Sequence, residues 1–179
     1  MDETVYALGD YGAGRFITTA DSSLPFQEMS DCPLLEWLSD GVDDPKILVF
    51  GWTESDGPAY WPPGTVVEGV HLPEEYIGNA AQLAADYDII EYLESSYQFG
   101  MDEPSDAEMD TLLEYVNTHG GGVYVSSEFG AINGPYLNAV DIASVNRLMI
   151  PMGVEAQAAS LNWGDVDGNI EFDCFPVPM

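Results

Sequence analysis

The sequence has very few basic residues. Only three of its 179 residues are lysine or arginine (Arg15, Lys46 and Arg147), whereas 32 are aspartate or glutamate, so the formal net charge is -29 at pH 7. Proteins bind nucleic acid largely through cationic side chains that displace counterions from phosphates, so this composition excludes sequence-general nucleic-acid binding. It also disfavours docking on anionic membranes. We therefore expect no nucleic-acid partner.

Long apolar runs are also missing. No stretch of about 18 consecutive apolar residues occurs, so we expect no insertion into a membrane. Hydrophobic residues nevertheless make up 46% of the chain and aromatic residues 12%, which is too much for a disordered tail and enough for a core. We expect a single domain over residues 1–179, with strands and a short helix in 1–44 and an α/β core in 45–179.

The surplus of carboxylates and the scarcity of cysteine bear on the environment of the protein. Unpaired carboxylates repel one another and destabilise the compact state at low salt, so we expect a salty or divalent-rich setting. A solvated surface that serves only solubility is the alternative. Cys32 and Cys174 are compatible with one disulfide, and residues 1–10 lack the basic and apolar segments of a secretory signal. Either the chain is cytoplasmic or its signal has been removed, and the scarcity of lysine and arginine favours the second. We therefore favour an extracellular or periplasmic location, with the cytoplasm of a halophile as the alternative.

Hydrophobic patterning predicts an alternation of strands and helices. Continuous apolar runs favour buried strands, and apolar residues at helical spacing favour helices. The expected strands are 4–8, 15–19, 46–52, 88–93, 123–126, 158–162 and 170–175, and the expected helices are 34–38, 73–85, 106–119 and 138–149.

The strongest local signal surrounds residue 105. Ser105 followed by Glu108 is a capping box, which marks the start of a helix. Three glycines from Gly120 onward end that helix, because glycine adopts positive φ without a Cβ penalty.

Strands alternating with helices indicate a parallel sheet covered by helices on both faces. The fold class expected is therefore α/β, a three-layer sandwich with a mainly parallel central sheet. Ligands of such sheets bind beyond the carboxyl ends of the strands, which we call the carboxyl edge. The segments expected there are 51–56, 94–98 and 126–130.

Three stretches resemble the class I glutamine amidotransferase-like superfamily, which includes the trehalose-utilisation (ThuA-like) branch. They are YDIIEYLESS (87–96), SDAEMDTLLEYVNTHGGGVYVSSEFG (105–130) and VNRLMIPMGV (145–154), and the resemblance covers residues 46–154. It implies a flavodoxin-like fold. Enzymes of the superfamily carry a nucleophilic cysteine at a strand-to-helix elbow, but this chain has none in the three edge segments. We therefore expect a non-catalytic or degenerate amidotransferase-like domain that acts in ligand binding or extracellular assembly.

A hydrolase acting on a carbohydrate or an ester is the alternative. The hydroxyl of Ser127, beside Glu128, could serve as a nucleophile with His71 as its base, although the sequence has no G-x-S-x-G elbow. We expect the other histidine, His119, to stabilise the end of its helix on the opposite side of the sheet.

A pair of carboxylates could instead act on a glycoside. Glu54, Asp56 and Glu128 would supply the carboxyl groups, and Trp52, Tyr60 and Trp61 would form platforms for a sugar. We favour a solvated acidic surface over this catalytic interpretation. A small molecule or a carbohydrate is the expected ligand, and its candidate contacts are Trp52, Glu54, Tyr60, Trp61 and Ser126.

One segment has the spacing of a calcium site. Asp165, Asp167, Asn169 and Glu171 offer oxygen ligands at alternate positions, as Ca²⁺ prefers. The segment departs from an EF-hand loop because Gly168 falls at the fourth position, and an ordinary turn is the alternative. A calcium-dependent acidic adhesion or structural module is thus a third interpretation. We expect no cofactor other than this Ca²⁺.

Overall fold

The computed structural model describes residues 6–19, 34–51, 64–94, 103–127 and 139–155. Within these ranges the chain forms strands and helices in alternation, as the patterning predicts. The strands are β1 (Tyr6–Tyr11), β2 (Gly14–Thr19), β3 (Ile47–Phe50), β4 (Val66–Val67), β5 (Ile89–Glu94) and β6 (Gly122–Ser127), and the helices are α2 (Leu34–Leu38), α3 (Ala80–Asp86), α5 (Asp106–His119) and α6 (Ala139–Met149).

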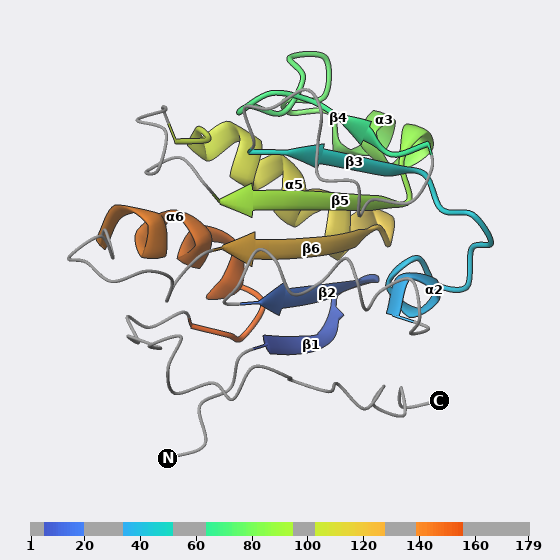
Figure 1. The fold of residues 1–179 in the computed structure, drawn as a ribbon, viewed down its shortest axis with the longest axis horizontal. Coiled ribbons are helices and arrows are strands. Elements are labelled where there is room, and N and C mark those ends of the chain that lie inside the picture. The colour runs from blue at the N-terminus through green and yellow to red at the C-terminus, as the bar shows by residue number, and fades with distance from the viewer. Residues whose placement is uncertain (1–5, 20–33, 52–63, 95–102, 128–138, 156–179) are drawn as a thin grey trace, which may run out of the picture.

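The six strands form one sheet in the order β1-β2-β6-β5-β3-β4 (Figure 1). Only the β1–β2 hairpin is antiparallel, and every other pair is parallel. The expected α/β class and mainly parallel sheet are therefore confirmed. The N-terminal hairpin extends this same sheet, because β2 pairs with β6.

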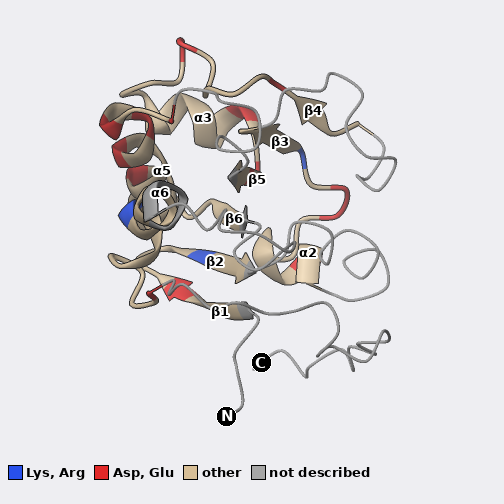
Figure 2. Cartoon of the chain, turned by 60° about the vertical axis from the view of Figure 1, so that its left-hand side comes forward, with Lys and Arg blue, Asp and Glu red and all other residues tan. Residues whose placement is uncertain are grey.

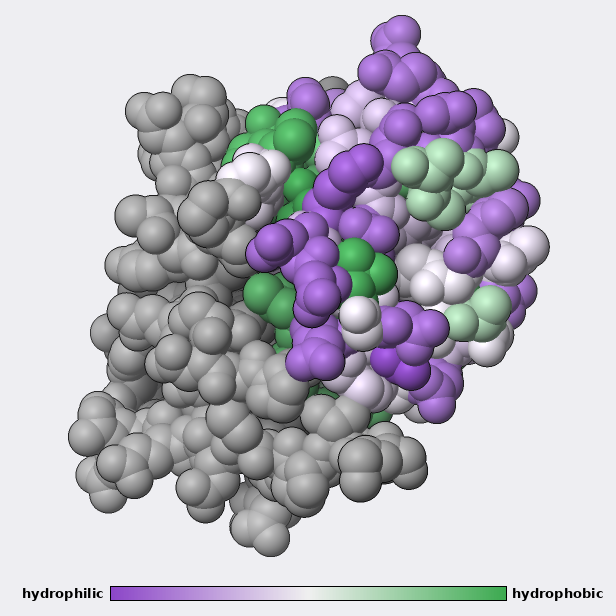
Figure 3. All heavy atoms as spheres, turned by 90° about the vertical axis from the view of Figure 1, so that its right-hand side faces the viewer, coloured by the Kyte–Doolittle hydropathy of each residue, from purple (hydrophilic) through white to green (hydrophobic). Residues whose placement is uncertain are grey.

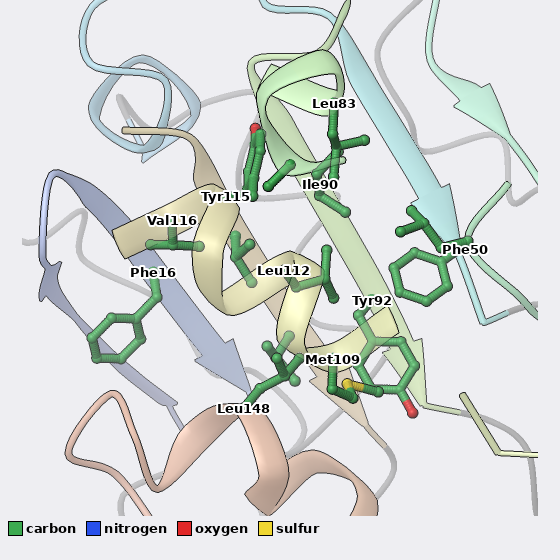
Figure 4. Packing of buried hydrophobic residues seen from close by; sticks show 14 of the residues in the cluster. Phe16, Phe50, Leu83, Ile90, Tyr92, Met109, Leu112, Tyr115, Val116 and Leu148 are labelled. Atoms are coloured by element: carbon green, nitrogen blue, oxygen red, sulfur yellow. The ribbon is translucent and has the colours of Figure 1, made fainter. Parts of the chain in front are cut away.

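Helices cover both faces of the sheet, an arrangement compatible with three layers (Figure 2). Leu48 and Phe50 of β3 point to one face, and Ile47 and Val49 point to the other, because successive residues of a strand alternate. The first face packs against α3, α5 and α6, with Leu112 and Leu148 fully buried (Figure 4). The second packs against α2, whose Leu38 is also buried.

The expected capping box begins α5. The Ser105 backbone N–H donates to Glu108 Oε2 at 2.6 Å, and the Glu108 backbone N–H donates to Ser105 Oγ at 3.3 Å. At the other end, Gly120 has φ 79 and adopts the left-handed conformation. Both helix boundaries predicted from the sequence are confirmed, because each is set by local chemistry.

Other boundaries differ from expectation. The helix expected from residue 73 begins only at Ala80, because hydrogen-bonded turns occupy 74–78 and Gly78 has φ 73, which ends them. The strand expected at 4–8 lies at 6–11, where its pairing with β2 sets the register. Strand β4 was not expected, and the strands predicted at 158–162 and 170–175 lie outside the described residues.

The two arginines fasten helices to the rest of the fold. Arg15 of β2 donates to the backbone oxygen of Trp37 at 2.5 Å and pairs with Asp40 at 2.7 Å, so it ties α2 to the sheet. Arg147 of α6 donates to Asp106 Oδ1 at 2.7 Å and ties α6 to the start of α5. Lys46 is exposed.

Hydrophilic residues dominate the described surface that faces the amino ends of the strands, with smaller apolar patches between them (Figure 3). Acidic residues also lie along the outer sides of the helices (Figure 2). No helix in the described ranges is long and apolar enough to cross a membrane.

Candidate functional site at the carboxyl edge

The three central parallel strands end together. Tyr92 of β5 is in register with Phe50 at the end of β3, and Glu94 is in register with Ser127 at the end of β6. The helix that follows β5, α5, begins on this same side of the sheet (Figure 1). The fold therefore produces the carboxyl edge that the sequence predicts. In parallel sheets generally, ligands bind at this edge.

Gly51 shapes the end of β3. Its φ is 95, and a Cβ at this position would lie 2.2 Å from the Leu93 backbone oxygen, so only glycine fits there. Its N–H donates to the Gly69 oxygen at 3.0 Å. This bond holds the chain after β4 against the end of β3, and His71 follows two residues later.

His71 is paired with a buried carboxylate. Its Nδ1 lies 3.3 Å from Glu108 Oε1, and 49% of the His71 side chain is exposed against 3% for Glu108. The two residues are 37 positions apart and come from different elements. An imidazole that is accessible on one side and fixed by a carboxylate on the other is suited to accept or donate a proton.

Neutral donors surround the Glu108 carboxylate. Oε1 accepts the backbone N–H of Leu72 at 2.8 Å, and Oε2 accepts both the N–H and the hydroxyl of Ser105, at 2.6 and 2.7 Å. Glu108 therefore caps α5, anchors the backbone beside His71 and orients the imidazole. The rotamer of Glu108 is fixed by these contacts.

A second network lies at the start of α5. The hydroxyls of Tyr92 and Ser144 are 3.1 Å apart and buried, and Arg147 donates to Ser144 Oγ at 3.3 Å and to the Pro104 oxygen. This network joins β5, α6 and the residues before α5. It therefore links α6 to the second half of β5 and to the residues that lead into α5.

Glu91 is a further buried carboxylate, located in the middle of β5. It is 1% exposed and lies in register between Val49 of β3 and Tyr124 of β6, on the face that α2 covers. It is thus on the opposite face from α5 and Glu108.

The structure brings some of the predicted site residues to the edge. Ser126 and Ser127 are the last residues of β6, and His71 reaches the same edge through the Gly69 contact. His119 ends α5, with Nε2 3.8 Å from Glu114, so its expected position at the far end of the helix is confirmed.

The remaining predicted positions lie outside the described residues. They are Trp52, Glu54, Asp56, Tyr60, Trp61 and Glu128 of the edge segments and Asp165, Asp167, Asn169 and Glu171 of the calcium segment. Among the residues that the structure does describe, no group of three His, Cys, Asp or Glu side chains is arranged to hold a metal ion.

The sequence did not indicate the contact of Glu108 with His71. The capping box accounts for Glu108 locally, and nothing in the sequence around His71 points to a partner 37 residues away. The signal available in the sequence is the position of Glu108, an acidic residue in the first turn of a helix that is expected to start at the carboxyl edge. Such a carboxylate is a candidate partner for a side chain at that edge.

Comparison with known proteins adds no relative. No protein-family model matches the chain, and neither a curated protein nor a solved structure matches it.

Proposed function

We propose that this chain is a ligand-binding domain, a non-catalytic or degenerate form of the amidotransferase-like fold, that takes a small molecule or a carbohydrate at the carboxyl edge. The proposal includes a flavodoxin-like arrangement of the layers. It also includes an extracellular or periplasmic setting, which the net charge of -29 supports.

The observation that carries the proposal is the common ending of β3, β5 and β6. Three adjacent parallel strands present their carboxyl ends at one edge, and Gly51 and His71 lie there. In parallel sheets generally, the loops after the strands vary while the sheet stays fixed, and ligands bind beyond the carboxyl ends of the strands.

The cysteine positions support a binding role over the chemistry of the superfamily. The only cysteines are Cys32 and Cys174, so the segments that directly follow β3, β5 and β6 in the sequence contain no thiol. The sequence therefore has no counterpart of the amidotransferase nucleophile in these segments.

The test is a thermal-shift screen of small molecules and sugars, run beside a turnover panel of esters and glycosides. Binding without turnover is the expected result. Turnover that Ser127→Ala or Glu128→Gln abolishes would overturn the non-catalytic assignment. Thr118→Ala and Glu114→Gln, on the exposed side of α5, are the matched controls.

A second candidate function, a hydrolase, is favoured by one observation, the pairing of His71 with Glu108. A base whose Nδ1 faces a buried carboxylate is the arrangement that general-base hydrolases use to orient their histidine. Hydrolysis of 4-nitrophenyl acetate that falls in His71→Gln and persists in His119→Gln would support this function. Equal rates in both variants would exclude it.

A further inference from the structure

We infer that His71 is the hydrogen-bond acceptor of the carboxyl edge, that Glu108 is its positioning residue, and that the ligand is a neutral molecule rich in hydroxyl groups. The inference rests on the proposed binding function and names the ligand class for it. It follows from the hydrogen bonds around Glu108, from the exposure of His71 and from the distribution of the basic residues.

The hydrogen-bond donors around Glu108 decide which ring nitrogen of His71 carries the hydrogen. Backbone N–H groups can only donate, and Leu72 and Ser105 place one on each oxygen of Glu108. The Ser105 hydroxyl also donates to Oε2. An ionised carboxylate accepts all of these bonds and one more from His71, so Nδ1 carries the hydrogen when the imidazole is neutral.

The other ring nitrogen of His71, Nε2, is then the acceptor. With the hydrogen on Nδ1, Nε2 of a neutral imidazole has a lone pair and accepts hydrogen bonds. Nδ1 faces the buried carboxylate, and about half of the side chain, 49%, is exposed. His71 therefore presents an acceptor rather than a donor toward a molecule bound at the edge.

The charged side chains bear on the class of ligand. An anionic ligand would need cationic partners, but Arg15 is bound to Asp40 and Arg147 is bound to Asp106. Lys46 precedes β3 and so lies at the amino end of that strand, away from the carboxyl edge. A cationic ligand would find the Glu108 carboxylate buried and already occupied by donors from Leu72 and Ser105 and by His71. A neutral ligand with hydroxyl groups donates to Nε2 and avoids the repulsion that an anion would meet from 32 acidic residues.

The chain provides its own control in His119. Here it is Nε2, rather than Nδ1, that faces a carboxylate, at 3.8 Å from Glu114 Oε1. This distance is too long for a hydrogen bond, and so we expect no fixed tautomer at His119. His71 and His119 are the only histidines, so a histidine ring spectrum contains two residues.

The experiment is an NMR measurement of the ring nitrogens of the full chain labelled with ¹⁵N, at a pH where both imidazoles are neutral. The His71→Gln and His119→Gln variants assign the two signals. Maltose, cellobiose and glycerol are then added as neutral hydroxyl-bearing probes, with acetate as an anionic probe and methylammonium as a cationic one.

The expected result is a protonated Nδ1 and an unprotonated Nε2 at His71, with a shift of Nε2 on addition of a sugar and no change at His119. In the Glu108→Ala variant, which leaves no side-chain acceptor at that position beside Nδ1, the fixed tautomer should be lost. Ser105→Ala, which weakens the cap but keeps the carboxylate, should retain it. Loss of the tautomer in Ser105→Ala as well would assign the effect to helix capping and overturn the role of Glu108.

The remaining outcomes separate this inference from the proposed function. A protonated Nε2 at His71, or a shift with acetate or methylammonium but not with the sugars, overturns the inference. In either case, binding of other small molecules in the thermal-shift screen leaves the proposed function standing. If no compound in that screen binds, the proposed function fails, whatever the tautomer of His71.

Discussion

Replacing Gly51 by alanine should damage the carboxyl edge through one identifiable contact. The residue has φ 95, and its new Cβ would lie 2.2 Å from the Leu93 oxygen. A left-handed φ costs a residue with a Cβ about 1–2 kcal/mol, and forcing packed atoms apart adds about 1–3 kcal/mol. We therefore expect Gly51→Ala to lower the free energy of unfolding by about 2–5 kcal/mol.

Gly64→Ala is the matched control. Gly64 has φ 94, almost the same as Gly51, but a Cβ there would meet no atom within 4 Å. The φ cost and the change in the entropy of the unfolded chain are common to both variants, so their difference isolates the contact with Leu93.

The assay is urea unfolding followed by circular dichroism. A difference of about 1–3 kcal/mol corresponds to a gap of roughly 1 M in the urea midpoints of the two variants. The ring signal of His71 should also change in Gly51→Ala, because the bond from Gly51 to Gly69 would be displaced. Equal midpoints for the two variants would refute the argument that close backbone approach requires glycine here.

Three further predictions concern α5, pH and salt. Ser105→Ala should lower the free energy of unfolding, measured in urea, by about 1 kcal/mol because it removes the N-cap of α5. The control Thr118→Ala, at an exposed position of the same helix, should change it little. Equal losses in the two variants would contradict the capping role of Ser105. Burial and the hydrogen bond to Asp86 raise the pKa of Tyr76 to about 12 from 10.0, so the folded state holds this proton more tightly. The contribution of Tyr76 to the free energy of unfolding is complete below pH 10 and is lost as the pH rises toward 12. Tyr76→Phe should therefore show a shallower fall in the free energy of unfolding across that range, and an unchanged slope would contradict this role of Tyr76. The net charge of -29 predicts a Tm, measured by calorimetry, that rises with NaCl because salt screens the repulsion between carboxylates. A larger rise with Ca²⁺ at equal ionic strength would support a calcium site in the segment from Asp165 to Glu171. Equal rises with the two salts would rule that calcium site out.

The parts of the fold that could be predicted from the sequence are those fixed by neighbouring residues. Helix α5 was predicted with both ends because Ser105, Glu108 and Gly120 act within one helical turn of its termini. Helix α2 was predicted with the same bounds, and β5 and β6 were predicted to within one residue at each end.

The parts that could not be predicted depend on pairing between distant residues. Strand β4 has two residues and forms only because Val66 and Val67 pair with β3. The pairing of β2 with β6, which puts the N-terminal hairpin in the sheet, likewise could not be predicted from the residues near β2 in the sequence. At the candidate site, His71 was proposed as a base for Ser127, but its contact with Glu108 was not predicted, because Glu108 belongs to a helix 37 residues later.

The position of β2 in the sheet has a consequence for the order of assembly. Arg15 aligns with Gly122, so the first hairpin has no parallel neighbour until β6 has been synthesised. Closing a loop of roughly a hundred residues costs chain entropy before any pairing compensates it, and contacts this distant slow folding. In nascent chains that end before β6, the hairpin would not yet be paired with the parallel strands. Helix α2 would likewise not yet be placed against the completed sheet, because Arg15 anchors it to β2.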